Sequence, residues 1–392
     1  MIAPLTVGVC PDFTEERWPS MDRVAAHLLA AIAADRRRLV AAEVLRPDFA
    51  RRAMRWSTGS VAYSIDRACN RFVDYPRHLR RVAMRHDVYH VLDHSYAHLA
   101  WHLPTETTVV TCHDLDAFRS IVDCEKEPRS VPFQAATRYI LGGLRRAAAV
   151  ACDTAAIADE LVRRSLVSPE RVAVVHLGVG ELFTAFPDRD ADASLARLLP
   201  FAADVPIVLH VGAAVARKRL DVLLRAFAGV QGVAPAARLV HAGQELSSEH
   251  TALARSLGIS ERVTVLSSLD DRQLAALYRR AAVVALPSDR EGFGLPVIEA
   301  LRSGTAVVAS DLTVLREVGG EAARYCRAGV VSEWSETLAH VIQRPGTAAD
   351  RAARADWAGS FTWSRYAEQM TRIYSGVVDR RMAQARCVQA TA

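Results

Sequence analysis

The sequence predicts an α/β protein made of two doubly wound, Rossmann-like domains with a cleft between them. Short apolar, β-branched runs alternate with segments of helical periodicity along the chain, which is typical of parallel sheets. The alternation stops once, in a polar segment that contains proline and aspartate, and then starts again. A chain of 392 residues is long enough for two such domains, each with its own core.

The first domain is predicted at residues 1–180. Amphipathic segments such as Met21–Ala33 and Ala155–Arg164 are expected to be helices. Residues 181–204, which form the polar segment, are predicted to be an interdomain linker. The expected strands of this domain are Leu5–Cys10, Leu39–Val44, Asp87–Leu92, Thr108–Cys112, Ala148–Ala151 and Val172–Leu177.

The second domain is predicted at residues 205–360. A last helix is expected at 361–379 and a loose tail at 380–392. The strands expected in this domain are Pro206–Val211, Ala237–His241, Arg262–Leu266, Val283–Leu286 and Ala306–Ala309. Its helical patterns occupy Leu220–Val230, Asp271–Ala281 and Glu333–Ile342.

Composition excludes several classes of protein. About half of the residues are apolar and about a quarter are charged, as in ordinary globular enzymes (51% and 24%). No apolar run approaches the length of a membrane span, and the N-terminus lacks the charged start of a signal peptide. The seven cysteines are an odd number without a C-x-x-C pair, which suits a reducing cytoplasm better than a disulfide framework or a zinc site.

The most informative segment is Glu291-Gly-Phe-Gly-Leu-Pro-Val-Ile-Glu299, in which two carboxylates flank a glycine-rich turn. A short helix is expected at Pro296–Ser303, with Gly304 just past its end. Free backbone N–H groups in such a turn bind phosphate, and Gly292 and Gly294 let the backbone approach closely. Carboxylates accept hydrogen bonds from hydroxyl groups, so the segment predicts a sugar-nucleotide site. The alternatives are a two-carboxylate hydrolase site and a surface turn with an acidic helix.

A basic loop follows the first strand of the second domain. Of the 49 basic residues only Lys126 and Lys218 are lysine, and Lys218 stands beside Arg217 in the segment that begins at Gly212. The loop lacks the spacing of a dinucleotide-binding or P-loop motif. Two fixed cations at the end of a strand can stabilise a diphosphate leaving group without a metal. The alternative is a basic surface turn that caps a helix.

Histidines provide two further candidates. Five histidines recur at every fourth position, and on a single helix they would form a metal-binding stripe. Residues 87–93 within this row look like a strand, however, so no metal site is predicted. His113 ends a strand on the cleft side, where it could hydrogen-bond a sugar or hold an acceptor; a satisfied core histidine is the alternative. The row consists of His86, His90, His94, His98 and His102.

Charge is uneven along the chain. Residues 36–85 carry thirteen arginines against four carboxylates, whereas the net charge of the whole chain is +5. Such a surface can face an anionic membrane or an acidic acceptor, and solvated helix faces explain it equally well. No motif with interleaved aromatic residues accompanies it, so nucleic-acid binding is not expected.

Together, these motifs resemble the family-4 glycosyltransferases of the GT-B fold. The segment 291–299 with the following residues 300–310 resembles the E-x7-E region of that family. The resemblance covers the whole second half of the chain and is thinner in the first. Its other parts are Val211–Lys218, Asp270–Tyr278 and Phe361–Trp363, and, in the first half, Thr111–Leu115 and Val175–Gly180.

The resemblance implies a retaining, metal-independent transfer of a sugar from a nucleoside diphosphate, as UDP-sugar or GDP-mannose, to an acceptor hydroxyl. It implies that Glu291 and His113 lie near the donor sugar and that Glu299 binds the ribose hydroxyls. It also implies that Arg217 and Lys218 hold the diphosphate and that the last helix crosses back onto the first domain. The remaining donor-binding positions would be Gly212, Gly292, Phe293, Gly294 and Leu295.

The sequence departs from the family pattern at three places. Ala213 stands where many members carry arginine, so Arg217 and Lys218 would hold more of the phosphate charge. The segment Gly8–Phe13 has one glycine where the family has a glycine-rich loop, and Leu177–Val179 replaces the usual Asn-Gly-Val.

The partners expected from the resemblance and the charge pattern are the nucleotide-sugar donor, a sugar or lipid-linked acceptor, and an anionic membrane surface. The expected setting is the synthesis of cell-envelope polysaccharide or glycolipid, in the cytoplasm or at the inner face of the membrane. Two rival functions remain open. One is a sugar-nucleotide 2-epimerase on the same fold, and the other is a non-catalytic sugar-nucleotide-binding partner of a larger synthase.

Overall fold

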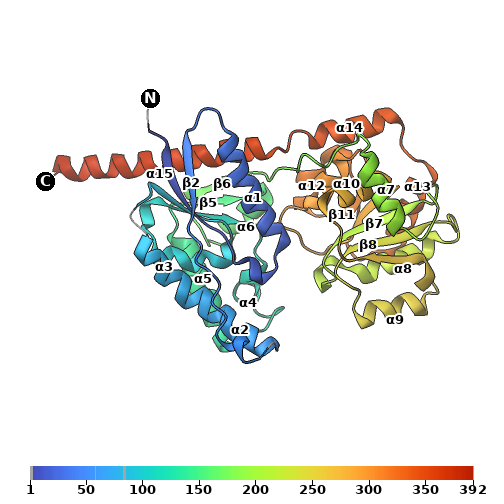
Figure 1. The fold of residues 1–392 in the computed structure, drawn as a ribbon, viewed down its shortest axis with the longest axis horizontal. Helices are drawn as coiled ribbons and strands as arrows, with labels where there is room; N and C mark the ends of the chain where they lie inside the picture. The colour runs from blue at the N-terminus through green and yellow to red at the C-terminus, as the bar shows by residue number, and fades with distance from the viewer. Residues whose placement is uncertain (1–2, 58, 83–84, 392) are drawn as a thin grey trace. The chain divides into compact units, whose positions relative to one another are not determined.

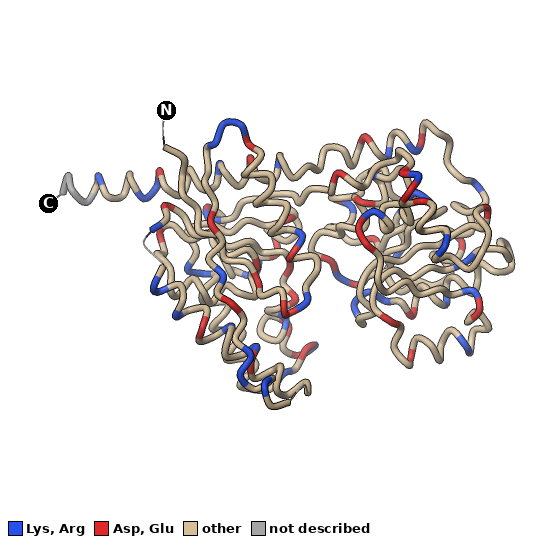
Figure 2. Tube along the Cα trace, in the orientation of Figure 1, with Lys and Arg blue, Asp and Glu red and all other residues tan. Residues whose placement is uncertain are grey.

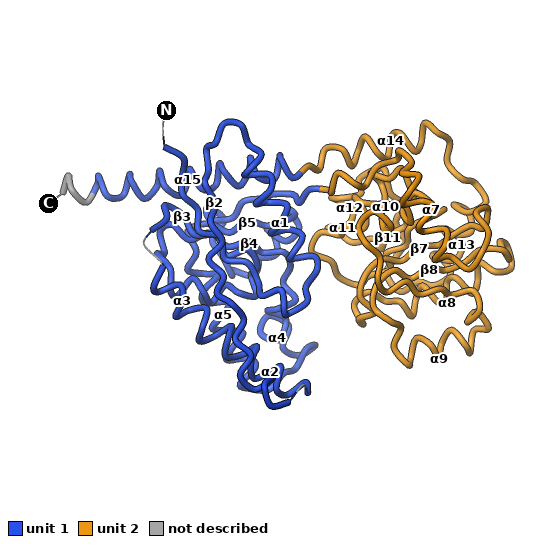
Figure 3. The backbone as a smooth tube through the Cα atoms, in the orientation of Figure 1, with its two compact units in different colours: residues 1–178, 363–392 blue, residues 179–362 orange. Residues whose placement is uncertain are grey.

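The computed structural model describes residues 3–57, 59–82 and 85–391, and the chain divides into two compact units (Figure 3). Unit 1 consists of residues 1–178 and 363–392, and unit 2 of residues 179–362. Each unit contains a six-stranded sheet whose neighbouring strands all pair in parallel. The predicted class of two doubly wound α/β units is therefore confirmed.

In unit 1 the strand order is β2-β1-β3-β4-β5-β6. The chain passes from β1 to β2 on one side and then returns to β3 on the other side of β1. The direction of winding therefore reverses between β1 and β3, which is where doubly wound sheets bind ligands. The strands are β1 (Leu5–Cys10), β2 (Val40–Val44), β3 (Val88–Val91), β4 (Thr108–Cys112), β5 (Ala149–Cys152) and β6 (Val172–Val174).

The helices of unit 1 include one from the far end of the chain. Helix α15 (Trp363–Thr391), red in Figure 1, contacts β3 and β5 and buries Tyr366, Met370 and Tyr374. The Tyr374 hydroxyl lies 2.8 Å from Nδ1 of the buried His90. The other helices and helical turns used below are η1 (Thr14–Glu16), α1 (Pro19–Ala34), α2 (Ser60–Cys69), η3 (Asn70–Asp74), α3 (Tyr75–Val82), η4 (His94–His102), α4 (Arg119–Val122), α5 (Val131–Arg146) and α6 (Ala155–Arg163).

In unit 2 the strand order is β12-β11-β10-β7-β8-β9. The winding reverses between β7 and β10, which are hydrogen-bonded neighbours. The loops that follow these two strands therefore start side by side at the carboxyl edge of the sheet. The strands are β7 (Ile207–Gly212), β8 (Arg238–Gly243), β9 (Val263–Leu266), β10 (Val283–Leu286), β11 (Ala306–Ser310) and β12 (Arg324–Cys326).

Helices α8 and α13 pack together over one face of this sheet. The apolar side chains of Phe227 and Trp334, one from each helix, are buried against Val208, Ala285 and Val308 of the strands. Helix α11 contacts β10 and β11. The helices of unit 2 are α7 (Arg189–Leu198), α8 (Leu220–Val230), α9 (Ser248–Ser256), α10 (Asp271–Arg280), α11 (Leu295–Arg302), α12 (Thr313–Gly319), α13 (Val331–Gln343) and α14 (Ala348–Ala358), with the helical turn η8 (Ala216–Lys218).

All eleven predicted strands are present, most of them within one residue of the predicted bounds. The largest difference is at β6, which ends at Val174 rather than Leu177. The sequence missed β12, because three residues at the edge of a sheet give too little periodicity to detect.

Two predicted irregular segments are helical in the structure. Within the predicted linker 181–204, α7 forms part of unit 2, capped by Asp188 and joined to α10 by an Arg279–Asp192 ion pair of 2.7 Å. The predicted loose tail 380–392 instead continues α15 as far as Thr391. The side chains after Val377 that the structure describes are not buried, so the helix-forming residues there sustain the helix without a core.

The histidine row does not lie on one helix. His90 is in β3, whereas His94 and His98 are in η4. His90 contacts Thr111 and Tyr374, and His98 lies 2.9 Å from the Arg71 carbonyl oxygen. Burial lowers the pKa of both imidazoles to about 3, so they are neutral parts of the core.

The packing of α5 on η4 gives a test of the fold. A Cβ atom at Gly143 would overlap the backbone carbonyl oxygen of Ala97, which a side-chain rotation cannot relieve. We expect Gly143→Ala to lower the free energy of unfolding by about 2 kcal/mol. Gly232→Ala is the control, because nothing lies within 4 Å of its Cβ position. Equal chemical-denaturation midpoints for the two variants would contradict the packing.

Candidate functional site

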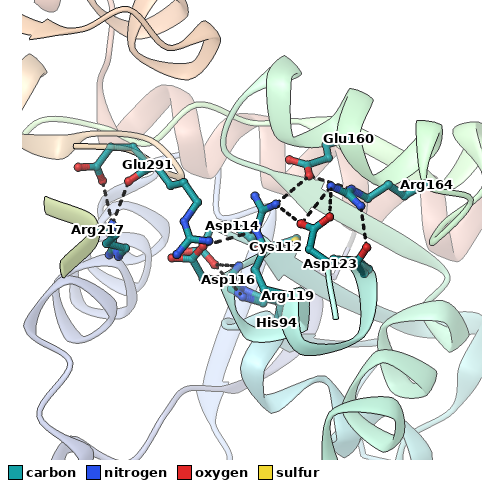
Figure 4. A network of polar contacts seen from close by, with 12 residues as sticks. His94, Cys112, Asp114, Asp116, Arg119, Asp123, Glu160, Arg164, Arg217 and Glu291 are labelled. Carbon is teal, nitrogen blue, oxygen red and sulfur yellow. Dashed lines mark hydrogen bonds and ion pairs between the residues drawn. The ribbon is translucent and has the colours of Figure 1, made fainter. Parts of the chain in front are cut away.

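Three charged side chains meet where the winding of unit 2 reverses. Lys218 and Arg217 lie in η8, after β7, and Glu291 follows β10. Lys218 Nζ lies 2.5 Å from Glu291 Oε1, and Arg217 Nη1 lies 3.4 Å from Glu291 Oε2. Figure 4 shows the Arg217 guanidinium pointing at this carboxylate. Ser288 adds a hydrogen bond, since its Oγ donates to Glu291 Oε1 at 2.6 Å.

Backbone contacts hold the two loops together. The Asp289 N–H donates to the Arg217 carbonyl oxygen at 2.8 Å, and Arg217 Nη1 donates to the Arg290 carbonyl oxygen at 3.2 Å. Arg219, at a left-handed φ of 47°, turns its guanidinium away to Asp221 and Asp289. The loops therefore fix the directions in which Arg217 and Lys218 point.

The Glu291 carboxyl is ionised. Burial raises its pKa, because only 6% of the side chain is exposed. The charges of Lys218 and Arg217 and the hydrogen bonds from Lys218 and Ser288 outweigh burial, and the net pKa lies below its ordinary value. An ionised, hydrogen-bonded carboxylate accepts hydrogen bonds and does not act as a general acid, so Glu291 has the wrong charge state for the acid of a two-carboxylate hydrolase.

The glycine turn leads directly into α11. Gly294 is the N-cap residue at a left-handed φ of 90°, and Pro296 occupies the first turn of the helix. A Cβ at Gly294 would also lie 2.7 Å from Leu315 Cδ2, so glycine is required there for two reasons. Phe293 is buried, with its ring 6.0 Å from that of Phe361. The buried Phe293 side chain thus holds the turn that connects Glu291 with α11.

Glu299 lies inside unit 2, on α11. Its side chain is buried, and Tyr278 of α10 donates its hydroxyl to Oε2 at 2.7 Å. This contact fixes one carboxylate oxygen from within the protein. Because Tyr278 is itself fully buried, the orientation of Glu299 depends on how α10 and α11 pack.

The structure thus brings Arg217, Lys218 and Glu291 into direct contact, and Gly212 lies at the start of the same loop. A Cβ at Gly212 would lie 3.7 Å from Lys218 Cε. Sequence reasoning assigned no role to Ser288 or Tyr278. Ser288 could have been found from its position three residues before Glu291, whereas the Tyr278–Glu299 contact depends on helix packing alone.

His113 belongs to unit 1, at the carboxyl end of β4. Its Nδ1 lies 2.7 Å from Asp153 Oδ2, and its Nε2 lies 2.8 Å from the Leu92 carbonyl oxygen. Both partners are acceptors, so both ring nitrogens carry protons. Burial lowers the pKa of His113, but the charge and hydrogen bond of Asp153 raise it to about 9. His113 is thus buried with both ring nitrogens hydrogen-bonded, as the alternative of a satisfied core histidine requires. A contact from its side chain to a sugar would require one of these hydrogen bonds to break.

A buried carboxyl pair occupies the point where the winding of unit 1 reverses. Asp12 follows β1, Asp93 follows β3, and both are buried. Burial, and after it the charge of Asp93, raises the pKa of Asp12 well above its ordinary value. Asp93 ionises more readily, because His94 and His113 oppose the effect of its burial and lower its pKa. The pKa values of the two carboxyls are thus shifted in opposite directions, and sequence reasoning assigned the pair no role.

Solved structures of other proteins share this fold. HepE from Anabaena, in complex with UDP and glucose, superposes with a TM-score of 0.70 at 17% identity, covering 95% of this chain and all of that one. Two parallel α/β units of this kind define the GT-B fold. Among residues 3–57, 59–82 and 85–391, no helix has the length and apolarity to cross a membrane.

Sequence comparison defines the family. The family model of glycosyl transferases group 1 matches residues 196–355, and that of Glycosyltransferase Family 4 matches residues 21–180. D-inositol 3-phosphate glycosyltransferase of Nocardia farcinica is 30% identical over 324 residues, or 76% of this chain and 69% of that protein. Its counterpart in Mycolicibacterium smegmatis is 34% identical over 223 residues, or 56% of this chain and 50% of that protein. The chain belongs to the group 1, family 4 glycosyltransferases, although its matches to several curated relatives span only about half of their length.

The His113–Asp153 pair predicts a pH dependence of stability. A histidine pKa raised to about 9 stabilises the fold fully below its unfolded value of about 6.5, and this contribution disappears as pH rises through 9. We expect Asp153→Asn to lower the free energy of unfolding by about 2 kcal/mol at pH 7. The difference from the wild type should shrink towards pH 10, and denaturation series at several pH values would measure it. A difference that is independent of pH would show that the pair is not charged.

Proposed function

We propose that this chain is a retaining glycosyltransferase that moves one sugar from a nucleoside-diphosphate sugar to an acceptor hydroxyl. The observation that carries the proposal is the Arg217–Lys218–Glu291 cluster beside the glycine turn of unit 2. It combines two oriented cations, backbone N–H groups at a helix start, and a carboxylate that accepts hydrogen bonds. Diphosphate, phosphate oxygens and sugar hydroxyls are the matching groups on a UDP-sugar or GDP-mannose.

The two cations support a reaction without a metal. As the bond between the sugar and the diphosphate breaks, negative charge grows on the leaving oxygen. Arg217 and Lys218 stabilise that charge from fixed positions, which is the role that a divalent ion has in other transferases. In this proposal Glu291 binds a hydroxyl of the donor sugar and Glu299 binds the ribose.

The transfer balances without a protein nucleophile. The acceptor oxygen forms a bond to the anomeric carbon on the face from which the diphosphate leaves, and the proton of the acceptor passes to a leaving phosphate oxygen. Retention of configuration follows, and no carboxylate on the opposite face is required. His113 is proposed to lie near the donor sugar, although its ring nitrogens bind Asp153 and Leu92 in the structure.

Unit 1 offers a site for the acceptor. A pocket of about 600 Å³ lies beside η1, where the chain leaves β1, and is lined among others by Glu15, Arg17, Arg51 and Tyr63. Its two arginines suit an acceptor that carries phosphate, as a phosphorylated polyol or as a lipid phosphate. We place the reaction in cell-envelope polysaccharide or glycolipid synthesis, in the cytoplasm or at the inner face of the membrane.

A first prediction concerns Lys218. We expect Lys218→Ala to reduce kcat/KM for sugar transfer by about 100-fold or more, because one of the two cations that face the leaving group is lost. Initial rates of nucleoside-diphosphate release at several donor concentrations would measure the loss.

Arg219→Gln is the matched control, because Arg219 lies in the same loop but pairs with Asp221 and Asp289. Its transfer rate should stay within about threefold of the wild type. A denaturation midpoint for Lys218→Ala near that of the wild type would confirm that its effect is on the reaction. Normal transfer by a folded Lys218→Ala protein would refute the role of this cation.

The proposed function is tested by ligand binding and product analysis. We expect UDP, GDP or ADP sugars, screened with EDTA present, to include one that raises the melting temperature by about 5 °C at 100 times its Kd. With an acceptor, NMR of the product should show retained anomeric configuration. Conversion of the donor to its 2-epimer without acceptor would identify an epimerase instead. Binding with neither transfer nor hydrolysis would identify a non-catalytic partner.

A further inference from the structure

Unit 1 exposes several large apolar side chains on α2 and on the segments that neighbour it. Trp56 is 91% exposed, and it is followed on α2 by Val61 (73%) and Ile65 (51%), which lie one turn apart. Helices α2, η3 and α3 run on without a break from Ser60 to Val82. Phe72 follows in η3, and it is 36% exposed.

Ring contacts connect Phe72 with exposed aromatic side chains of η4 and α5. The Phe72 ring lies 4.7 Å from the buried His98 ring in η4, which lies 6.1 Å from Tyr139 in α5. Tyr139 stacks at 6.0 Å on Trp101, and these two rings are 40% and 42% exposed. The set of Trp56, Val61, Ile65, Phe72, Trp101 and Tyr139 is called the apolar band below.

The exposed rings are held rigidly rather than left loose. Trp101 Nε1 donates to the Tyr139 carbonyl oxygen at 3.0 Å, and the two ring planes are within 4° of parallel. The Trp101 ring also packs over Gly142, where a Cβ would approach it to 2.8 Å. A rigid aromatic surface in contact with water costs free energy, which burial against another surface recovers.

The charges around the apolar band are positive. Arg146 lies 5.1 Å from the centre of the Trp101 ring, and Arg80 lies 3.2 Å from the His102 ring. The sequences of α5 and η4 contain no carboxylate. On α2 and η3 the two carboxylates are already bound: Asp66 accepts from the backbone N–H groups of residues 52–54, and Asp74 pairs with Arg52 at 2.7 Å.

The basic segment 36–85 of the sequence is not itself this surface. Arg46 turns inward to the Asp12 carbonyl oxygen at 2.6 Å, and the Arg71 side chain is 8% exposed. The arginines of residues 36–38 lie in the turn after α1, at the top of unit 1 in Figure 2. From this segment only Trp56, α2 and η3 contribute to the apolar band. The band's other members, in η4 and α5, follow the segment in the sequence.

We propose that the apolar band binds an anionic lipid bilayer, with its aromatic and aliphatic side chains in the interface and the arginines around it on anionic headgroups. Trp, Tyr and Arg are the side chains that suit this depth, because each has an apolar body and a polar end. Each basic residue near an anionic surface adds about 1 kcal/mol of attraction. The inference rests on the proposed function, since it makes the acceptor a lipid-linked one.

The position of α2 connects the bilayer with the acceptor site. Ser60 and Tyr63, from the first turn of α2, line the pocket of unit 1, and Val61 and Ile65 of the same turns belong to the apolar band. A lipid-linked hydroxyl that emerges from the headgroups therefore meets the pocket within one or two helical turns of the bilayer. A water-soluble acceptor would need no such arrangement.

Flotation with the full chain tests the proposal. We expect it to float with vesicles of phosphatidylcholine and phosphatidylglycerol, to remain at the bottom with phosphatidylcholine alone, and to lose binding as salt rises. The double variant Val61→Glu, Ile65→Glu should bind the anionic vesicles at least about tenfold more weakly. The matched control is Phe186→Glu, Val233→Glu, which changes two exposed apolar side chains of unit 2 (79% and 48%) and should float normally.

Two further measurements distinguish misfolding, dimer formation and loss of lipid binding. Donor-induced thermal shifts should be equal in the wild type and both double variants. Loss of the shift in Val61→Glu, Ile65→Glu alone would mean that this variant misfolds, and Trp56→Glu would then replace it in the flotation assay. If the wild type and both double variants float equally well, the apolar band is not the surface that contacts lipid. A dimer in light scattering that Val61→Glu, Ile65→Glu dissociates would assign the band to a second copy of the chain. A wild-type protein that shows a normal donor-induced thermal shift but does not float would refute membrane binding and leave the proposed donor site unaffected.

Discussion

The loops at the carboxyl edge of the unit 2 sheet depend on one buried carboxylate that holds two cations. Glu291 alone would be costly to ionise at 6% exposure, and Lys218 at 12% exposure would also lose hydration. Together they stabilise each other, and Ser288 satisfies part of the remaining capacity of the carboxylate. The pairing requires β7 and β10 to be neighbours, so the strand order of unit 2 is what gives this loop pair its chemistry.

Much of this organisation could be predicted from the sequence, because buried parallel strands are continuous apolar runs. Val283–Leu286 and Thr108–Cys112 have the predicted bounds for that reason. The sequence also predicted the Arg217–Lys218 loop and the glycine turn as two separate candidate binding segments. That they touch through Glu291 could not be predicted, since the contact joins residues 73 positions apart and depends on strand order.

Other contacts left no signal in the sequence. A single aspartate after a strand, such as Asp12, has no spacing that distinguishes it from a surface turn, and only the structure shows that it is buried beside Asp93. The Tyr278–Glu299 bond depends on how two helices pack. Helix α7 was mistaken for a linker because its apolar face is short, with only Ala191 and Leu195 buried. In each case the structure depends on contacts between residues far apart in the sequence, which the local sequence pattern does not specify.

Helix α15 has a consequence for how the protein is made. Tyr366, Met370 and Tyr374 are fully buried in unit 1, yet they follow the whole of unit 2 along the chain. On the ribosome, residues 179–362 are all synthesised before the core of unit 1 can be completed. Unit 1 therefore waits, with the sites on β3 and β5 that later receive α15 uncovered, while unit 2 already has every residue that it needs. The unit made first is the last to finish folding.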